Sequence, residues 1–99
     1  MVINNTVKDS AVLINKKDNT ITALKNIIKG GRVRFGNRMI EIRDEISVGH
    51  KIAVKKIKKG EAIIKYGESI GTAYKDIIPG QLVHSHNLES SRARGDKKV

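Results

Sequence analysis

The residues whose types could do chemistry gather in the second half of this 99-residue chain. His50 and Lys51 stand near its middle, and the run HSHN occupies positions 84–87. If this run is a strand, His84 and His86 project from one face about 6.6 Å apart and could hold one divalent metal. His50 could supply a third imidazole from a neighbouring strand. The alternative is that these are surface or hydrogen-bonded histidines that hold no metal.

A second group of polar side chains surrounds Gly67. Tyr66, Glu68 and Ser69 place a phenol, a carboxylate and a hydroxyl within four positions. Such a group could transfer a proton or bind the hydroxyls of a substrate. The alternative is an ordinary polar turn between two strands.

The charge of the chain narrows the classes of partner. Its net charge of +10 is compatible with nucleic acid, an acidic protein or an anionic small molecule. Five lysines without an intervening acid lie between positions 51 and 59, which indicates either an anion-binding edge or a solvated face. Nucleic acid is disfavoured because almost no aromatics are interleaved with the cations. Phosphate-binding loops and nucleophile elbows are absent from the sequence.

Composition predicts a single domain with an aliphatic β core. The core must be rich in Ile and Val because the chain has three aromatic residues, and β-branched residues favour strands. We expect a domain over residues 1–90 and a basic tail over 91–99. The absence of cysteine excludes disulfides and suits a reducing, cytoplasmic setting. We expect no signal peptide and no membrane-spanning segment, because no apolar run is long enough.

The sequence around these candidate side chains contains a short repeated pattern, which should form the scaffold that positions them. Alanine, isoleucine, glycine and an apolar residue recur at offsets of zero, four, seven and ten, beginning at Ala23, Ala53 and Ala73. Alanine and isoleucine four apart would share one face of a helical turn, and the glycine would end it. Each copy therefore predicts a one-turn helix that leads into a strand.

Other segments predict hairpins and one longer strand. Thr20 stands where it could cap a short helix over 21–28. Residues 33–35 and 39–42 predict a hairpin about Gly36-Asn37, and Tyr66-Gly67 predicts a second turn. Apolar residues at positions 46, 48, 52 and 54 predict a strand, which would place His50 on its apolar face if it continues across Gly49.

Three motifs together resemble a known family. GHK at 49–51, KGEAIIKYGESIG at 59–71 and LVHSHN at 82–87 are similar to the small N-terminal domain of the altronate/galactarate dehydratase family. This domain is of the SAF type and has a β-clip fold. The resemblance covers residues from about 10 to 96, and the combination is far more specific than any one motif. It implies a mainly β, SAF-like β-clip domain, here with short helical turns.

The resemblance also implies a function and its residues. The family removes water from hexonic or hexaric acids and is associated with a divalent metal, usually Fe²⁺. Some members fuse this domain to a large catalytic domain, and others encode it as a small subunit, including a relative that acts on sulfolactate. The matched positions predict catalytic roles for His50, Lys51 and Tyr66. They also predict a substrate contact at Asn87 and metal ligands at His84 and His86. Glu68 and Ser69 are predicted as substrate contacts from their chemistry beside Tyr66.

The expected partners follow from this reading. The chain would act with a large catalytic dehydratase subunit on an anionic sugar acid, and the sequence leaves a homo-oligomer open. Such a dehydratase removes a proton beside a carboxylate and expels a β-hydroxyl, which requires a base, a cation and a Lewis acid. The competing hypotheses are a non-catalytic β-clip module that binds an anionic ligand or nucleic acid, and a subunit that only stabilises its partner.

Overall fold

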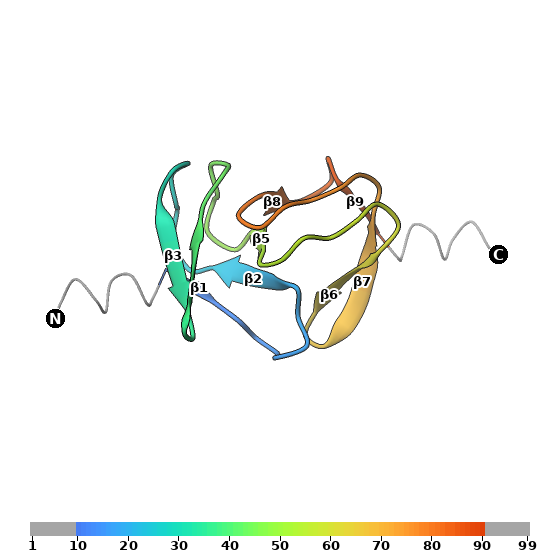
Figure 1. Cartoon of the computed structure of the whole chain (residues 1–99), viewed down its shortest axis with the longest axis horizontal. Coiled ribbons are helices and arrows are strands. Elements are labelled where there is room, and N and C mark those ends of the chain that lie inside the picture. Colours follow the sequence, from blue (N-terminus) through green and yellow to red (C-terminus); the bar gives the residue numbers. More distant parts are fainter. Residues whose placement is uncertain (1–9, 91–99) are drawn as a thin grey trace, which may run out of the picture.

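The computed structural model describes residues 10–90, and this part of the chain forms nine β-strands and no helix (Figure 1). The mainly β prediction is confirmed. The expected basic tail, 91–99, lies outside the described residues, as do residues 1–9. The strands are β1 (Ala11–Val12), β2 (Thr20–Ala23), β3 (Arg32–Phe35), β4 (Arg38–Glu41), β5 (Lys51–Ala53), β6 (Ala62–Lys65), β7 (Glu68–Ala73), β8 (Leu82–Val83) and β9 (Leu88–Ser90).

A central antiparallel sheet separates two outer layers. Its strand order is β1-β2-β5-β8. The hairpin β3–β4 lies on one side, and the antiparallel sheet β6-β7-β9 lies on the other (Figure 1). The described part of the chain contains no apolar helix of membrane-spanning length.

Each side of the central sheet has its own core. Ile21 and Ile52 are paired neighbours in β2 and β5, and both pack into the cluster that includes Val33 of the β3–β4 hairpin. Ala53 and Val83 belong to a second cluster with Ile63 of β6 and others. Neighbouring residues of a strand point to opposite faces, so one short sheet serves both cores. Each fully buried isoleucine contributes roughly 1.5–3 kcal/mol through the hydrophobic effect.

The predicted helical turns are wrong, because the repeated units pair with one another as extended chain. Ile27 and Ile46 exchange two backbone hydrogen bonds of 2.8 and 2.9 Å, and Ile57 and Ile77 exchange two of 2.8 Å. One isolated helical turn fixes many dihedral angles for a single hydrogen bond. A bridge between two units satisfies both isoleucine backbones and buries both side chains, so tertiary pairing prevails.

The structure also reveals a fourth unit, which begins at Ile42 instead of alanine and continues through Ile46, Gly49 and Ile52. In every unit the glycine has a φ between +87° and +94°. Its N–H donates to the carbonyl of the first residue of the partner unit. The four bonds are Gly30 to Ile42 (2.7 Å), Gly49 to Ala23 (2.8 Å), Gly60 to Ala73 (2.6 Å) and Gly80 to Ala53 (2.8 Å). Two matching pairs of units therefore build two halves.

The described structure tests three further predictions. Both hairpin turns are confirmed, at Gly36-Asn37 and at Tyr66-Gly67. Thr20 begins β2 and does not cap a helix. The strand expected from 46 to 54 is restricted to β5, because Gly49 takes a φ of +87° that ends the extended chain.

Candidate catalytic and ligand-binding site

Two of the three histidines lie side by side at one end of the central sheet. Lys51 of β5 pairs with Val83 of β8, which brings the preceding His50 next to the following His84. Their ring centroids are 4.9 Å apart, with the planes tilted by 57°. Among the described residues, Nδ1 of His50 is buried without a hydrogen-bond partner. A buried polar atom in this state is uncommon and marks a position to examine for function.

The segment that carries His84 and His86 is a turn and not a strand. The strand geometry that would aim both imidazoles the same way is therefore wrong. Asn87, 2% exposed, holds this turn: its Oδ1 accepts from the His84 N–H at 2.9 Å, and its Nδ2 donates to the Leu82 carbonyl at 2.8 Å. The Tyr74 hydroxyl also donates to the Ser85 carbonyl at 2.9 Å. The amide of Asn87 is thus engaged in orienting the turn.

Desolvation and nearby positive charges lower the pKa of Lys51 and of His84. Half-buried Lys51 has a pKa lowered first by desolvation and then by the positive charge of Lys65. The pKa of His84 is lowered first by desolvation and then by the positive charges of His50, Lys51 and His86. A neighbouring positive charge disfavours protonation, so it favours the neutral form of Lys51 and of His84. Sequence reasoning gave Lys65 no role, although it lies in the motif at 59–71, because its proximity to Lys51 arises only in the fold.

Tyr66 lies in the turn between β6 and β7 and has an unusual backbone. Its φ is +59°, a left-handed conformation that bulky residues rarely adopt. Its side chain is 61% exposed, and Nζ of Lys65 lies 5.1 Å from the ring centroid. Lys65 therefore connects Tyr66 electrostatically to Lys51. Backbone strain of this kind costs about 1–3 kcal/mol and clusters at functional sites.

A buried carboxylate holds that turn in place. Asp18, 5% exposed, accepts backbone N–H bonds from Tyr66 at 3.1 Å and Gly67 at 2.7 Å, and a third from Asn15 at 3.1 Å. Asn19 also holds strand β6 of this hairpin. Its Oδ1 accepts from the N–H of Ile64, and its Nδ2 donates to the carbonyl of Ala62. Sequence reasoning missed both residues because their hydrogen-bond partners on the hairpin lie 43 to 49 positions away in the chain.

Glu68 and Ser69 begin β7, and both are exposed. Glu68 is opposite Lys65 in the strand register, and the Ser69 hydroxyl donates to the Gly71 carbonyl at 3.2 Å. Both residues therefore lie on the Tyr66 hairpin, while the two adjacent imidazoles belong to β5 and β8.

The described residues fit a metal only in part. No group of three or more His, Cys, Asp or Glu side chains between residues 10 and 90 is arranged to hold one. His50 and His84 bring two imidazoles together, one with an unpartnered buried nitrogen. Two imidazoles are less than the ligand set of a catalytic metal, which normally has three protein ligands.

These features together favour the handling of an anion and a proton. Lysines beside a substrate carboxylate supply positive charge, and an imidazole held neutral can accept a proton. The fold and this cluster define a small all-β domain that presents basic side chains at the end of a short central sheet.

Comparison with known proteins places the chain in a family. The model of the altronate/galactarate dehydratase SAF domain matches residues 9–91, so the chain belongs to that family. It is 43% identical over 82 residues to an altronate dehydratase of Bacillus subtilis and 38% identical over 80 residues to one of Escherichia coli. These alignments cover 83% and 81% of this chain but 16% of each relative.

A shorter relative is matched over more of its length. The chain is 44% identical over 48 residues to the (2R)-sulfolactate sulfo-lyase subunit alpha of Paracoccus pantotrophus, which is 48% of this chain and 72% of that protein. The named relatives are lyases, and the domain is a small part of the dehydratases.

Proposed function

We propose that this chain is the small component of a sugar-acid dehydratase and contributes basic side chains to a site completed by a larger catalytic chain. The substrate would be a hexonic or hexaric acid such as altronate or galactarate. The observation that carries the proposal is the contact of His50 with His84 beside half-buried Lys51, in a member of this family. His84 and Tyr66 are exposed in the described structure, so the site as described does not exclude water alone.

Each side chain has a role in this proposal. Lys51, with Lys65, would hold the substrate carboxylate. His84, kept neutral by its lowered pKa, would accept the proton beside that carboxylate, and His50 would orient it. Elimination then breaks the bond from the β-carbon to its hydroxyl, which leaves as water after it takes up a proton.

The remaining residues would bind and position the substrate. Tyr66 would donate a proton or a hydrogen bond to the departing hydroxyl from its exposed position on the hairpin. Glu68 and Ser69 would contact other substrate hydroxyls. Asn87 would act as a positioning residue, through its hydrogen bond to the backbone of His84.

A divalent metal, Fe²⁺ in our proposal, would be shared with the larger chain. His86 would be the ligand from this chain and the partner would complete the set, because a metal-bound imidazole at His84 could not also accept the substrate proton. When bound, the metal would supply a Lewis acid for the leaving hydroxyl. This part of the proposal rests on the chemistry of the donor set, since the described residues provide only part of a ligand set.

A second candidate is the small subunit of a sulfolactate sulfo-lyase. It is favoured by the match to 72% of a subunit alpha of that enzyme. The same basic cluster would hold the carboxylate of that substrate. A purely anion-binding β-clip module is the remaining alternative.

The test is reconstitution with the larger dehydratase chain of the same genome. The full chain, co-expressed with that partner and supplied with Fe²⁺, should catalyse loss of water from altronate or galactarate. His84→Asn should reduce kcat by about 10²–10⁴, the usual contribution of a general base. Lys51→Met should mainly raise KM. Copurification with the partner should be unchanged in both variants.

Lys58→Gln is the matched control, because it removes an exposed charge of the third unit that is not among the charges acting on His84. Preferential turnover of sulfolactate would support the second candidate. Full activity of both His84→Asn and Lys51→Met would contradict a catalytic role for this cluster. Salt-sensitive binding of DNA by the isolated chain, without turnover by the complex, would support the binding module.

A further inference from the structure

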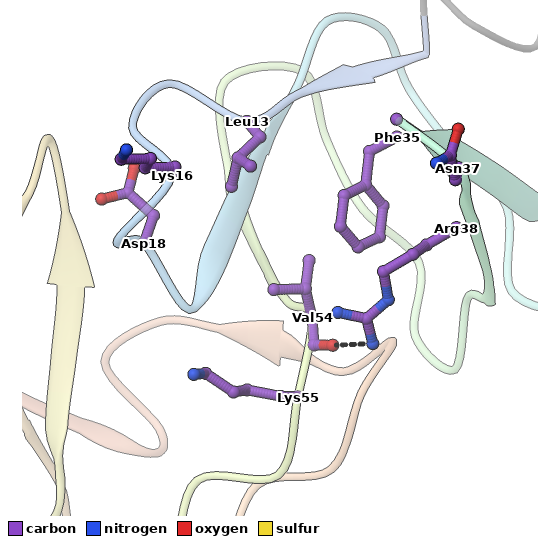
Figure 2. Close-up of a pocket in the computed structure, with 9 residues that line it drawn as sticks. Leu13, Lys16, Asp18, Phe35, Asn37, Arg38, Val54 and Lys55 are labelled. Carbon is purple, nitrogen blue, oxygen red and sulfur yellow. Dashed lines mark hydrogen bonds between the residues drawn. The ribbon is translucent and has the colours of Figure 1, made fainter.

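A cleft of about 390 Å³ opens on the side of the central sheet that faces the β3–β4 hairpin (Figure 2). Its walls are the loop after β1, the tip of that hairpin and the residues that follow β5. Its size lies within the usual range of small-molecule sites. The lining residues are Leu13, Lys16, Asp18, Phe35, Gly36, Asn37, Arg38, Val54 and Lys55.

The cleft combines an apolar floor with a fixed cation. Phe35 and Val54 are 9% and 3% exposed and belong to the first core cluster, with Leu13 packed beside them. The Arg38 guanidinium carbon lies 5.3 Å from the Phe35 ring centroid, and Nη2 donates to the Val54 carbonyl at 3.3 Å. Figure 2 shows this head group between Phe35 and Val54. The stacking and the hydrogen bond fix its position before any ligand arrives.

The lining carries more positive than negative charge. Lys16, Arg38 and Lys55 are cationic, while Asp18 is the acidic residue among the described lining side chains. Both oxygens of Asp18 already accept backbone N–H bonds, so this carboxylate is directed to the loop and the Tyr66 turn. Within residues 10–90, no carboxylate forms an ion pair with Arg38. A guanidinium has five N–H donors in a fork suited to a carboxylate, and one bond to Val54 leaves donors available.

We propose that this cleft binds a small carboxylate with an apolar body, its carboxylate on Arg38 and its body against Leu13, Phe35 and Val54. Lys16 and Lys55 add positive charge around it. The site is distinct from the basic cluster described above. Val54 packs in the first core, while Ala53 packs in the second, and Lys51 lies on the same face of β5 as Ala53. The inference is therefore independent of the proposed dehydratase function.

The experiment follows backbone amide resonances of the full chain during titration with three probes. Phenylpropionate has both the charge and the apolar body, phenylpropanol has only the body, and acetate has only the charge. We expect phenylpropionate to bind at least about tenfold more tightly than either other probe, as an added charge-assisted hydrogen bond allows. The shifted amides should centre on Leu13, Phe35, Arg38 and Val54.

Arg38→Gln should weaken phenylpropionate binding by about tenfold or more. Arg34→Gln is the matched control, because Arg34 is an exposed arginine of the same hairpin that does not line the cleft. His84→Asn should leave the affinity unchanged if the two sites are distinct. Equal binding of acetate and phenylpropionate, or equal losses in the two arginine variants, would overturn the proposal in favour of a general attraction of anions to a basic surface. The selectivity of the unaltered chain decides the question even if Arg38→Gln fails to fold.

Discussion

The two halves of the molecule share one scaffold and differ where the chemistry is expected. Each half has two glycine-ended units joined by a hairpin, with its own apolar cluster. The first hairpin turn uses Gly36 at a φ of +60°, while the second places Tyr66 at +59°. The same backbone is thus built without strain in one half and with strain in the other.

The second hairpin also contains one additional residue. Its register shifts between Ile63 and Ile64, so that Ile63 pairs with Gly71 and Ile64 with Ser69, while the first hairpin runs without a shift. Such a bulge increases local twist and redirects side chains. The departures from the common scaffold, the bulge and the left-handed tyrosine, both lie in the half that carries Tyr66, Glu68 and Ser69. We infer that the first half mainly preserves the scaffold.

The largest loss of stability should come from substituting the glycines that end the repeated units in both halves. A Cβ at Gly80 would collide with the Glu41 carbonyl, where the two halves meet, and its φ is +94°. Gly80→Ala should cost about 2–5 kcal/mol, the sum of left-handed strain and overpacking. Gly60→Ala has a φ of +91° but open space around the Cβ, so it should cost only about 1–2 kcal/mol. Urea unfolding of both variants measures the difference, and equal losses would mean that the halves do not pack closely at Gly80.

The next effect concerns the clamp on the second hairpin. Asp18→Ala leaves three backbone N–H groups, of Asn15, Tyr66 and Gly67, without their acceptor and should cost about 2–4 kcal/mol. Asp76→Ala is the control, because Asp76 accepts one N–H bond from Lys59 at an exposed site and should cost about 0.5–1 kcal/mol. Thermal unfolding measures both. A loss at Asp18 no larger than at Asp76 would show that the turn does not depend on the clamp.

The mainly β class was predictable because its signals are local. Aliphatic β-branched composition and the turn residues Gly36-Asn37 and Tyr66-Gly67 specify strands and hairpins regardless of partners. The repeat was visible too, but its conformation was not. Residues four apart suit a helical turn, and only pairing between Ile27 and Ile46, nineteen positions apart, makes them extended. The fourth unit escaped because Ile42 replaces alanine.

The candidate site was predictable by residue type and less so by geometry. Histidines and a tyrosine are rare enough to notice, so His50, His84 and Tyr66 were found. Lys65 and Asp18 were not, because a lysine among many and an acid in a charged stretch acquire meaning only through contacts made across the fold. The strand expected for 84–86 failed since Asn87 closes a turn with its side chain, a preference that spacing alone does not reveal.

A smaller effect is expected when the second turn is made like the first. Tyr66→Gly removes left-handed strain of about 1–2 kcal/mol and loses the Lys65 cation–π contact of about 0.5–1 kcal/mol. The variant should therefore be more stable by about 0.5–1 kcal/mol in urea unfolding, while turnover by the complex falls. Gly36→Ala, the reciprocal change, should lose about 1 kcal/mol. A destabilised Tyr66→Gly would show that this tyrosine supports the fold and would weaken its proposed functional role.

The smallest effect concerns the titration of the two imidazoles. Lys51→Met removes a positive charge beside His84, so the pKa of His84 should rise toward 6.5, as followed by imidazole proton resonances. Desolvation is the larger cause and persists, so the return should be incomplete. Lys58→Gln should leave this pKa unchanged, because Lys58 is not among the charges that lower it.

The sign of the accompanying pH dependence follows from linkage. Because its pKa is lowered, folded His84 binds protons less readily than unfolded His84, so folding stability falls as the pH drops below 6.5 toward the folded pKa. The loss should be smaller in Lys51→Met and absent in His84→Asn. An unchanged His84 pKa in Lys51→Met would mean that the lysine does not act on the imidazole. The base would then owe its neutral form to burial and to the other imidazoles, and Lys51 would be left to bind the substrate anion.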